Sequence, residues 1–398
     1  MDGLRPMWAA FRLGLGNFRA RPRNALLIAA GLLVASFTVL VLLTLSAGLK
    51  RIAGRTGLPD VAVVLSGSGF DETDGGIDPE LVARIGVLPG VALRSDGSPR
   101  IAPQFVVTSQ MPRRDGASGT LLVRGVSPQV WDVVGDAVRL AEGKRPEAGV
   151  MELISGTTAS QIYPFTDTGA NLSLVKRSTS QWTVSGEFSA GNGLWESELW
   201  ADLENLRGQF NADGQTTSVW VRLVSPDALK EFAAAMQADP RLRGLKVYRQ
   251  NGFYAQRVMF LDLFVLAASL VIAIVLGVLA ILAGNSSIGL ALRARRRELA
   301  VLRAIGYGNG ALFVALLLEV VLLAVICALF AAAAAWVLLH AHQVDSSSAG
   351  ISIRFAMEVT GGVVGLVVAY AVALGIVSAI VPAWRALHAP LVKSLASE

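Results

Sequence analysis

Residues that could carry out chemistry are few in this chain of 398 residues. The only histidines are His340, His342 and His388, and the only cysteine is Cys327, so residues 50–256 contain neither type. Ser-His-Asp catalysis, Cys-His catalysis and most zinc sites are therefore excluded from that stretch. A single cysteine also excludes an intrachain disulfide. We predict no catalytic, cofactor-binding or metal-binding residues, and we interpret the histidine pair as interfacial and Cys327 as a packing residue.

A nucleotide-binding loop is also missing from the sequence. A phosphate-cradling loop needs the spacing G-x-x-x-x-G-K-[ST], and the nearest candidate, at Gly143, Lys144 and Arg145, lacks the leading glycine and the hydroxyl. The chain is therefore not expected to be an enzyme. Any ATP-driven role requires a partner that holds ATP and magnesium.

Two carboxylates, Asp262 and Glu319, lie one or two helical turns inside long apolar runs. A carboxylate at the centre of a membrane costs about 2.5–3.5 kcal/mol on insertion scales, and less near the interface. Such residues can form a proton relay, but one carboxylate near each end of a span does not make one. We favour structural anchoring.

The elements that would position these residues are four apolar runs. Hydrophobic residues make up 53% of the chain and charged residues only 16%, where soluble proteins have about a quarter charged. A bilayer core of about 30 Å requires about 20 helical residues, and each run is long enough. We predict four transmembrane helices, at 25–49, 257–284, 311–340 and 359–383. The first is interpreted as a retained anchor because no cleavage site follows it.

Basic residues indicate the orientation of these helices. Residues 1–24, 285–310 and 384–398 together carry twelve basic and three acidic residues, whereas the segment between the first two runs is nearly neutral. Lysine and arginine near helix ends are retained in the cytoplasm. We therefore expect both termini and the 285–310 loop to be cytoplasmic. The domain at 50–256 and a short loop at 341–358 would face outward, and the basic charge would serve the membrane rather than nucleic acid.

The outward domain is predicted to be α+β. Strand patterns occur at 61–65, 104–108, 121–126, 171–175, 182–187 and 219–224, and helix patterns at 79–86 and 226–238. We expect two lobes, the second a strand-rich insertion at about 115–214. Before the first span, residues 1–24 have the amphipathic pattern of a helix lying in the headgroup layer and contacting lipids, or one packed on protein.

Small residues recur every four positions along the fourth span. Gly361, Gly365, Ala369 and Ala373 would form a ladder that lets helices approach closely. The ladder favours self-association or packing of this span, although bacterial membrane helices are rich in glycine and alanine in any case.

A second candidate site is the cytoplasmic stretch after the second span. Ile288, Leu292, Leu299 and Leu302 would share one helical face, and basic residues surround it. An apolar face on a short cytoplasmic helix needs a cover. A partner would supply that cover. Alternatively, the arginines serve only orientation and lipid phosphates.

Three segments resemble the FtsX-like permease family. Residues 292–306 followed by 316–319 are similar to its signature, and residues 381–387 with Pro390 are similar to its closing motif. Residues 184–188 and 195–202 resemble the MacB-like core domain, and 238–242 resemble stand-alone DevC-type exporter permeases. The family also includes LolC/LolE-type lipoprotein extractors.

The resemblance implies an α-helical inner-membrane permease with four transmembrane helices and a MacB-like α+β domain between the first two. It implies a homodimer that binds two ATPase subunits, and it allows a periplasmic adaptor and an outer-membrane channel. The family's ATPase-docking helix maps onto Leu292, Arg295, Arg296, Arg297, Glu298, Leu299, Leu302 and Arg303. We expect an exporter subunit of an ABC transporter that transmits ATPase movement outward. The alternatives are a regulator of an outer-side hydrolase and a lipoprotein or lipid extraction subunit.

Overall fold

The computed structural model describes residues 22–175, 180–339, 343–348, 351–357 and 359–388. The expected amphipathic helix at 1–24, the residues His340 and His342, and Pro390 lie wholly or mostly outside this part of the chain. The chain divides into a helical unit (Met1–Gly48, Leu263–His342 and Ala356–Glu398) and a sheet unit (Leu49–Asp262 and Gln343–Phe355).

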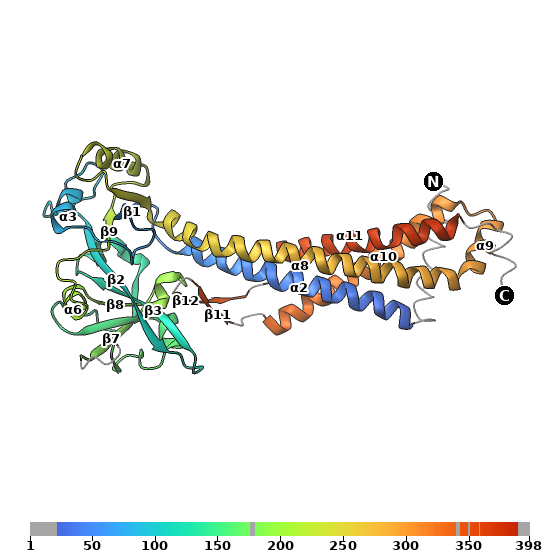
Figure 1. Cartoon of the computed structure of the whole chain (residues 1–398), viewed down its shortest axis with the longest axis horizontal. Helices are drawn as coiled ribbons and strands as arrows, with labels where there is room; N and C mark the ends of the chain where they lie inside the picture. Colours follow the sequence, from blue (N-terminus) through green and yellow to red (C-terminus); the bar gives the residue numbers. More distant parts are fainter. Residues whose placement is uncertain (1–21, 176–179, 340–342, 349–350, 358, 389–398) are drawn as a thin grey trace. The chain divides into compact units, whose positions relative to one another are not determined.

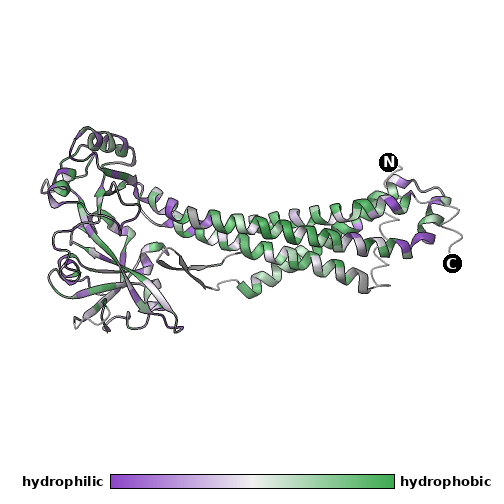
Figure 2. Ribbon diagram, in the orientation of Figure 1, coloured by the Kyte–Doolittle hydropathy of each residue, from purple (hydrophilic) through white to green (hydrophobic). Residues whose placement is uncertain are grey.

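Within the described residues, four helices are long and apolar enough to cross a membrane. They are α2 (Pro22–Arg55), α8 (Gln250–Ala294), α10 (Asn309–Leu339) and α11 (Gly361–Leu387), and most of their length has the hydrophobic colour in Figure 2. Each overlaps one of the four predicted spans, and α11 begins two residues later than predicted. At 45 residues, α8 is about 68 Å long at 1.5 Å per residue, more than twice a bilayer core. A short helix, α9 (Arg296–Ala304), follows it.

Small side chains allow the membrane helices to pack closely. A Cβ on Gly375 of α11 would lie 3.3 Å from both Ala324 and Val320 of α10. Cys327 is buried in the same core, as the sequence predicts for a packing residue, beside Leu32 and Ala35 of α2. The Tyr370 hydroxyl donates a 2.7 Å hydrogen bond to the Ala273 carbonyl and so joins α11 to α8.

The sheet unit is built on one mixed sheet with the strand order β10-β1-β9-β2-β3-β8-β5-β7-β4, and β6 pairs with β7 (Figure 1). Most neighbours are antiparallel, but β3 runs parallel to β8 and β5 runs parallel to β7. The bounds are β1 Val61–Ser66, β2 Ile101–Pro112, β3 Ser118–Val126, β4 Arg139–Gly143, β5 Glu152–Gly156, β6 Asn171–Leu172, β7 Trp182–Ser189, β8 Glu198–Asp202, β9 Ser218–Arg222 and β10 Leu245–Arg249. The six strand patterns of the sequence are confirmed, with different ends.

Helices cover the sheet over two apolar cores. One core buries Ile85 and Phe232 of α3 (Pro79–Gly86) and α7 (Leu229–Ala238) against β1 and β9. The other buries Trp182 and Leu206 among β3, β5, β7 and β8. The remaining helices are α4 Val130–Val134, α5 Thr157–Ile162 and α6 Leu203–Gln209, with 3₁₀ turns η1 Gly135–Ala137, η2 Leu194–Ser197 and η3 Pro226–Ala228. Strands of one continuous sheet therefore contribute to both cores.

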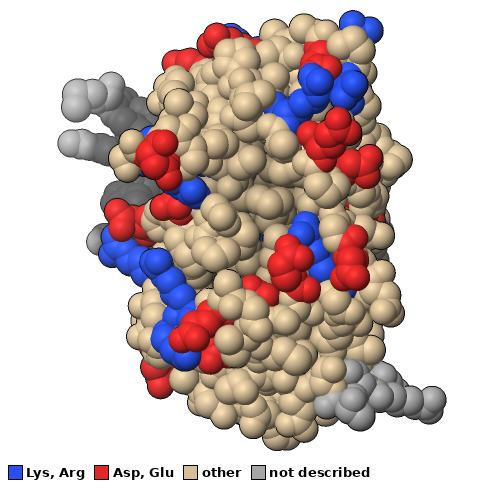
Figure 3. Space-filling view, turned by 90° about the vertical axis from the view of Figure 1, so that its left-hand side faces the viewer, with Lys and Arg blue, Asp and Glu red and all other residues tan. Residues whose placement is uncertain are grey.

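One feature differs from the sequence-based expectation. The stretch expected as a short outer loop contains a hairpin, β11 (Gln343–Ser348) paired with β12 (Ile351–Ala356). On the face of the sheet unit shown in Figure 3, acidic and basic side chains lie beside one another in small groups rather than in one large patch of a single sign.

Candidate functional site

The centre of the sheet unit contains a buried ionic cluster around Arg124 of β3. This side chain is fully buried, at 0% exposure. Its Nε and Nη2 donate to both carboxylate oxygens of Glu198 on β8, at 2.7 and 2.8 Å. Its Nη1 and Nη2 donate to both oxygens of Glu72, in the loop after β1, at 2.9 and 3.0 Å. One guanidinium group therefore joins a strand of the sheet to a distant loop by two bidentate ion pairs.

Neutral donors satisfy the remaining capacity of the two carboxylates. The Trp220 indole donates to Glu72 Oε1 at 3.0 Å, and the Ser218 hydroxyl donates to the same oxygen at 3.2 Å. The Trp200 indole donates to Glu198 Oε2 at 3.1 Å. A buried charge is tolerable only when it is paired and hydrogen-bonded, and this cluster meets both conditions.

Ionisation in the cluster is set by a competition between burial and pairing. Burial opposes the charge on Glu72, but the charge and hydrogen bonds of Arg124 outweigh it and hold the pKa of this carboxyl below its usual range. Burial also opposes the charge on Arg124, but Glu198 and Glu72 raise its pKa well above the ordinary value. Glu72 and Arg124 are therefore both charged at neutral pH.

The first turns of helix α8 are attached to this cluster. The Tyr254 hydroxyl donates a 2.8 Å hydrogen bond to Glu72 Oε2, and this side chain is buried. One turn further along α8, Arg257 forms an ion pair with Asp71, the neighbour of Glu72. The ring of Trp195 packs edge-on against Tyr254, with centroids 5.8 Å apart. The helix that leads into the second apolar run is thus fixed to the sheet by charge, hydrogen bonding and packing.

The end of helix α2 is attached to the same region. The Thr56 hydroxyl accepts a 2.7 Å hydrogen bond from the backbone N–H of Leu194. The next residue, Gly57, has a φ of +86°, and a Cβ there would lie 2.7 Å from the backbone nitrogen of Asn251 at the start of α8. Glycine is required by both the conformation and the close approach.

The two predicted intramembrane carboxylates each have a basic partner. Asp262 pairs with Lys50 at 3.3 Å, so that α8 and the end of α2 are joined again within the sheet unit. Glu319 of α10 pairs with Arg295 at 3.2 Å. Arg295 lies between α8 and α9 with a φ of −103° and a ψ of 9°, where the helical path is interrupted. Anchoring, rather than a proton relay, stays the prediction for both pairs.

The predicted docking segment comprises Leu292 at the end of α8, the break at Arg295 and helix α9, which ends in a glycine cap. Gly306 has a φ of +101°. The Tyr307 amide donates to the Leu302 carbonyl at 3.1 Å and the Gly306 amide to the Arg303 carbonyl at 3.2 Å. This double hydrogen bond is a Schellman motif, in which glycine takes the left-handed position.

The apolar face of the docking segment needs a correction. Leu292 and Leu299 are buried with Ile288 against Val320 of α10 and Ala379 of α11, so the chain itself provides the cover that the sequence left open. Leu302 is half-buried. The exposed side chains of this segment include Arg296, Arg297, Glu298, Val301 and Ile305, with Arg303 half-buried. A partner at this helix would contact these residues rather than the leucine face.

The small-residue ladder of α11 lies on an exposed face of the helix and not at a contact inside the chain. Gly361, Gly365, Ala369 and Ala373 are exposed, and no atom of the described chain lies within 4 Å of a Cβ built on either glycine. The close contacts inside the chain are made by Gly375, Gly284 and Gly277 instead. The ladder does not pack α11 on its described neighbours, and its role in self-association stays a prediction.

The ionic cluster was missed by sequence reasoning, although one signal was present. Arg124 interrupts a strand whose neighbours Leu121, Leu122, Val123 and Val126 are all buried. A charged residue in such a strand requires a buried counter-charge. The sequence does not say which of the acidic residues supplies it, because Glu72 and Glu198 are 52 and 74 positions away.

Comparison with known proteins agrees with the resemblance seen in the sequence. Residues 268–391 match the family model described as FtsX-like permease C-terminal. No curated protein matches the chain by sequence.

Among solved structures, the periplasmic region of MacB from Actinobacillus actinomycetemcomitans is 14% identical, with a TM-score of 0.37, over 50% of this chain and 92% of that one. The extracellular domain of the noncanonic ABC-type transporter YknZ from Gram-positive bacteria is 15% identical, with a TM-score of 0.34. That match covers 47% of this chain and 99% of the other.

Proposed function

We propose, from the match of residues 268–391 to the FtsX-like permease C-terminal family model, that this chain is the membrane subunit of an ABC-type exporter. In this proposal two separate ATPase subunits bind a homodimer of the chain on the cytoplasmic side. Their closure and opening move the sheet unit, which lies outside the membrane and acts on cargo there, with or without an adaptor protein. ATP and magnesium belong to the ATPase subunits.

A mechanical route through α8 supports this proposal. The helix is continuous over 45 residues, from Gln250 to Ala294, and a hydrogen-bonded helix transmits displacement along its axis. Next to one end, Arg295 is held by Glu319 beside the start of α9. At the other end, Tyr254 is bonded to Glu72.

The observation that carries the proposal is the attachment of Tyr254 to the buried Arg124 cluster. A mobile loop at this point would absorb the displacement of α8. Two bidentate ion pairs with no exposure to water resist it, because separating buried charges is costly. Movement of α8 would therefore reach β3 and β8 and not stop at the surface of the sheet unit.

The direct test is affinity purification of the full chain from its native membrane, followed by identification of the co-purifying proteins. We expect an ATPase with a phosphate-binding loop in an amount equal to that of the chain, and ATP hydrolysis by the complex. Purification of the folded chain without any ATPase, under several mild detergents and in nanodiscs, would overturn the proposal.

A further inference from the structure

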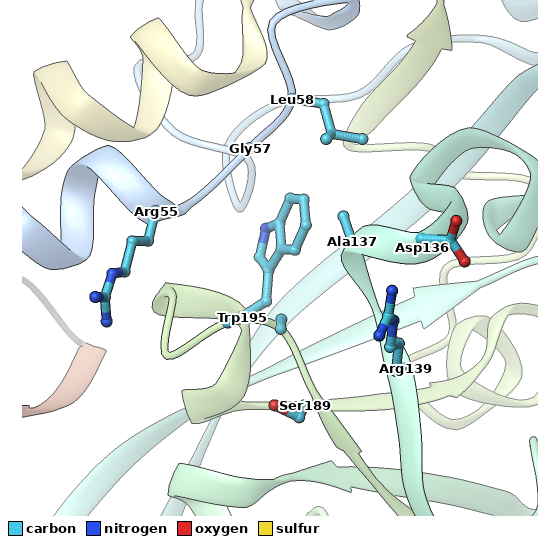
Figure 4. Close-up of a pocket in the computed structure, with 10 residues that line it drawn as sticks. Arg55, Gly57, Leu58, Asp136, Ala137, Arg139, Ser189 and Trp195 are labelled. Atoms are coloured by element: carbon cyan, nitrogen blue, oxygen red, sulfur yellow. The ribbon is translucent and has the colours of Figure 1, made fainter.

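A pocket of about 450 Å³ lies in the sheet unit beside the end of α2. Its volume is within the range of about 300–1,000 Å³ typical of small-molecule sites. The lining side chains include Arg55, Leu58, Asp136, Arg139, Ser189 and Trp195 (Figure 4). We propose that this pocket binds the phosphate-bearing headgroup of an amphiphile.

Two guanidinium groups give the pocket its positive charge. Arg55 is the last residue of α2, and Arg139 is the first residue of β4, where it lies opposite Ser189 of β7 in the antiparallel register. Neither arginine forms an ion pair within the part of the chain that the structure describes, and both are exposed. Asp136 is the third charged lining residue, so the three together leave the pocket with a positive excess. Guanidinium groups donate hydrogen bonds in a planar fork that suits phosphate oxygens.

The opposite part of the pocket is apolar. Trp195, at 2% exposure, stands across from Arg139 in Figure 4, with Leu58 and Ala137 nearby. An inorganic anion would leave the half-buried side chains of Leu58 and Ala137 uncovered, whereas the glycerol and first acyl carbons of an amphiphile would contact them. Asp136 offers an acceptor for a headgroup hydroxyl or ammonium group.

The position of the pocket along α2 favours an amphiphile over a soluble metabolite. Arg55 lies six positions beyond residue 49, the end of the first predicted span, in one continuous helix. Six residues correspond to about 9 Å of helix, which is close to the depth of the headgroup layer on one side of a bilayer, about 5–8 Å. A lipid headgroup that leaves the bilayer beside α2 would therefore meet the pocket within a short distance of the membrane surface.

The pocket also lies next to residues that attach α2 and α8 to the sheet. Arg55 precedes Thr56, which bonds to Leu194, and Trp195 packs against Tyr254 at 5.8 Å. A ligand that contacts Arg55 and Trp195 at once would bridge the end of α2 and the anchor of α8. Binding requires this chain alone, so its failure would leave the proposed transport role intact.

The test is calorimetric titration of the full chain in phosphatidylcholine nanodiscs with dihexanoylphosphatidylglycerol, with empty nanodiscs as the blank. Arg139→Gln should weaken binding about 10- to 100-fold, the usual effect of losing a hydrogen bond to a charged group. Ala137→Phe, which fills the pocket without changing its charge, should weaken binding as well. The matched control is Arg145→Gln, because Arg145 is an exposed arginine stacked on Trp131 outside the pocket lining.

Three results would overturn the inference. Equal affinity of the wild type, Arg139→Gln and Ala137→Phe would place the lipid elsewhere. Inorganic phosphate bound as tightly as the short-chain lipid would make the pocket a simple anion site. No heat above the blank would mean that no such site exists. Arg139 is exposed and Ala137 is half-buried, and the thermal unfolding midpoint of each variant shows whether it is folded.

Discussion

The hydroxyl of Tyr254 donates a 2.8 Å hydrogen bond to Glu72 Oε2, and Glu72 is held at both oxygens by Arg124. A residue in the first turns of a 45-residue helix is thereby connected to the centre of the sheet. Removal of any one member should affect the attachment of α8 more than it affects either the helix or the sheet alone.

Tyr254→Phe tests this connection by deleting one oxygen atom. A hydrogen bond to a charged group contributes about 1.5–3 kcal/mol, so we expect the free energy of unfolding of the sheet unit to fall by about that amount. In a complex with the ATPase, we expect ATP hydrolysis to continue while cargo movement declines. The control is Tyr248→Phe, on half-buried β10, which should change neither. Full cargo movement in Tyr254→Phe would mean that the hydrogen bond between Tyr254 and Glu72 is not needed to transmit movement.

Comparison of the wild type with Glu72→Gln tests how the stability of the attachment depends on pH. The folded-state pKa of Glu72 is lowered, so its contribution to stability is complete above the unfolded-state pKa of about 4.3 and is lost as the pH falls through the lower folded-state value. The wild type should be more stable than Glu72→Gln at pH 7, and the difference in unfolding free energy should shrink below about pH 4.3.

Chemical unfolding of both proteins between pH 7 and pH 3 measures this difference. Glu80→Gln is the control, because Glu80 is exposed in a surface pair with Arg241, and such pairs contribute about 0–1 kcal/mol. A gap between the wild type and Glu72→Gln that widens on acidification would contradict the assigned direction.

Cysteine labelling tests the orientation predicted from the basic residues. Asp115→Cys, in the sheet unit, should react with a membrane-impermeant maleimide in intact cells. Gly308→Cys, between α9 and α10, should react only after permeabilisation. Both positions are exposed and the native Cys327 is buried, so background labelling should be low. Labelling of Gly308→Cys in intact cells would exclude a four-span arrangement with cytoplasmic termini.

Leucine substitutions on the two faces of α11 separate self-association from folding. At Gly375 a larger side chain would meet Val320 and Ala324, whose atoms lie 3.3 Å from a Cβ, so Gly375→Leu should destabilise the helical unit by about 1–3 kcal/mol or more. At Gly365 the surroundings are open, so Gly365→Leu should leave the chain folded but reduce the dimer fraction in cross-linking. A full dimer fraction in folded Gly365→Leu would remove the ladder from the interface.

Sequence reasoning located the membrane helices because a bilayer imposes a length and a composition on every span. It also found strands such as β1 and β7, whose buried side chains set them apart from their surroundings. The missed strands lack that pattern, since all five residues of β4 are exposed and β8 is buried at both apolar and charged positions. The hairpin β11–β12 contains three consecutive serines, at 346–348, which resemble a loop.

The site was harder to predict because it depends on tertiary packing. Glu72, Arg124, Glu198 and Tyr254 come from a loop, two strands and a helix, and no local spacing relates them. At α9 the pattern correctly marked Leu292 and Leu299 as a face that needs a cover. It could not tell whether the cover belongs to another protein or, as found, to α10 and α11.

That difference changes the expected behaviour of two substitutions in the cytoplasmic segment. Glu298 is exposed on α9, whereas Leu299 is 8% exposed within the helical core. If α9 docks on the ATPase, Glu298→Lys should abolish co-purification or uncouple ATP hydrolysis, because reversing a charge at an interface disfavours the partner by several kcal/mol. Leu299→Asp should instead lower the yield and thermal stability of the chain itself, because it places an unpaired charge in an apolar core.

The measurement is ATPase recovery and turnover in nanodiscs, together with the unfolding midpoint of each variant. Ile305→Asp, at an apolar side chain that is 67% exposed, should resemble Glu298→Lys, since loss of apolar contact area weakens an interface without unfolding the subunit. Arg385→Ala is the control, because it is exposed on α11 and outside the docking segment. If Glu298→Lys and Ile305→Asp both retain a full complement of active ATPase, α9 is not the docking helix and its arginines serve only the orientation of the chain in the membrane.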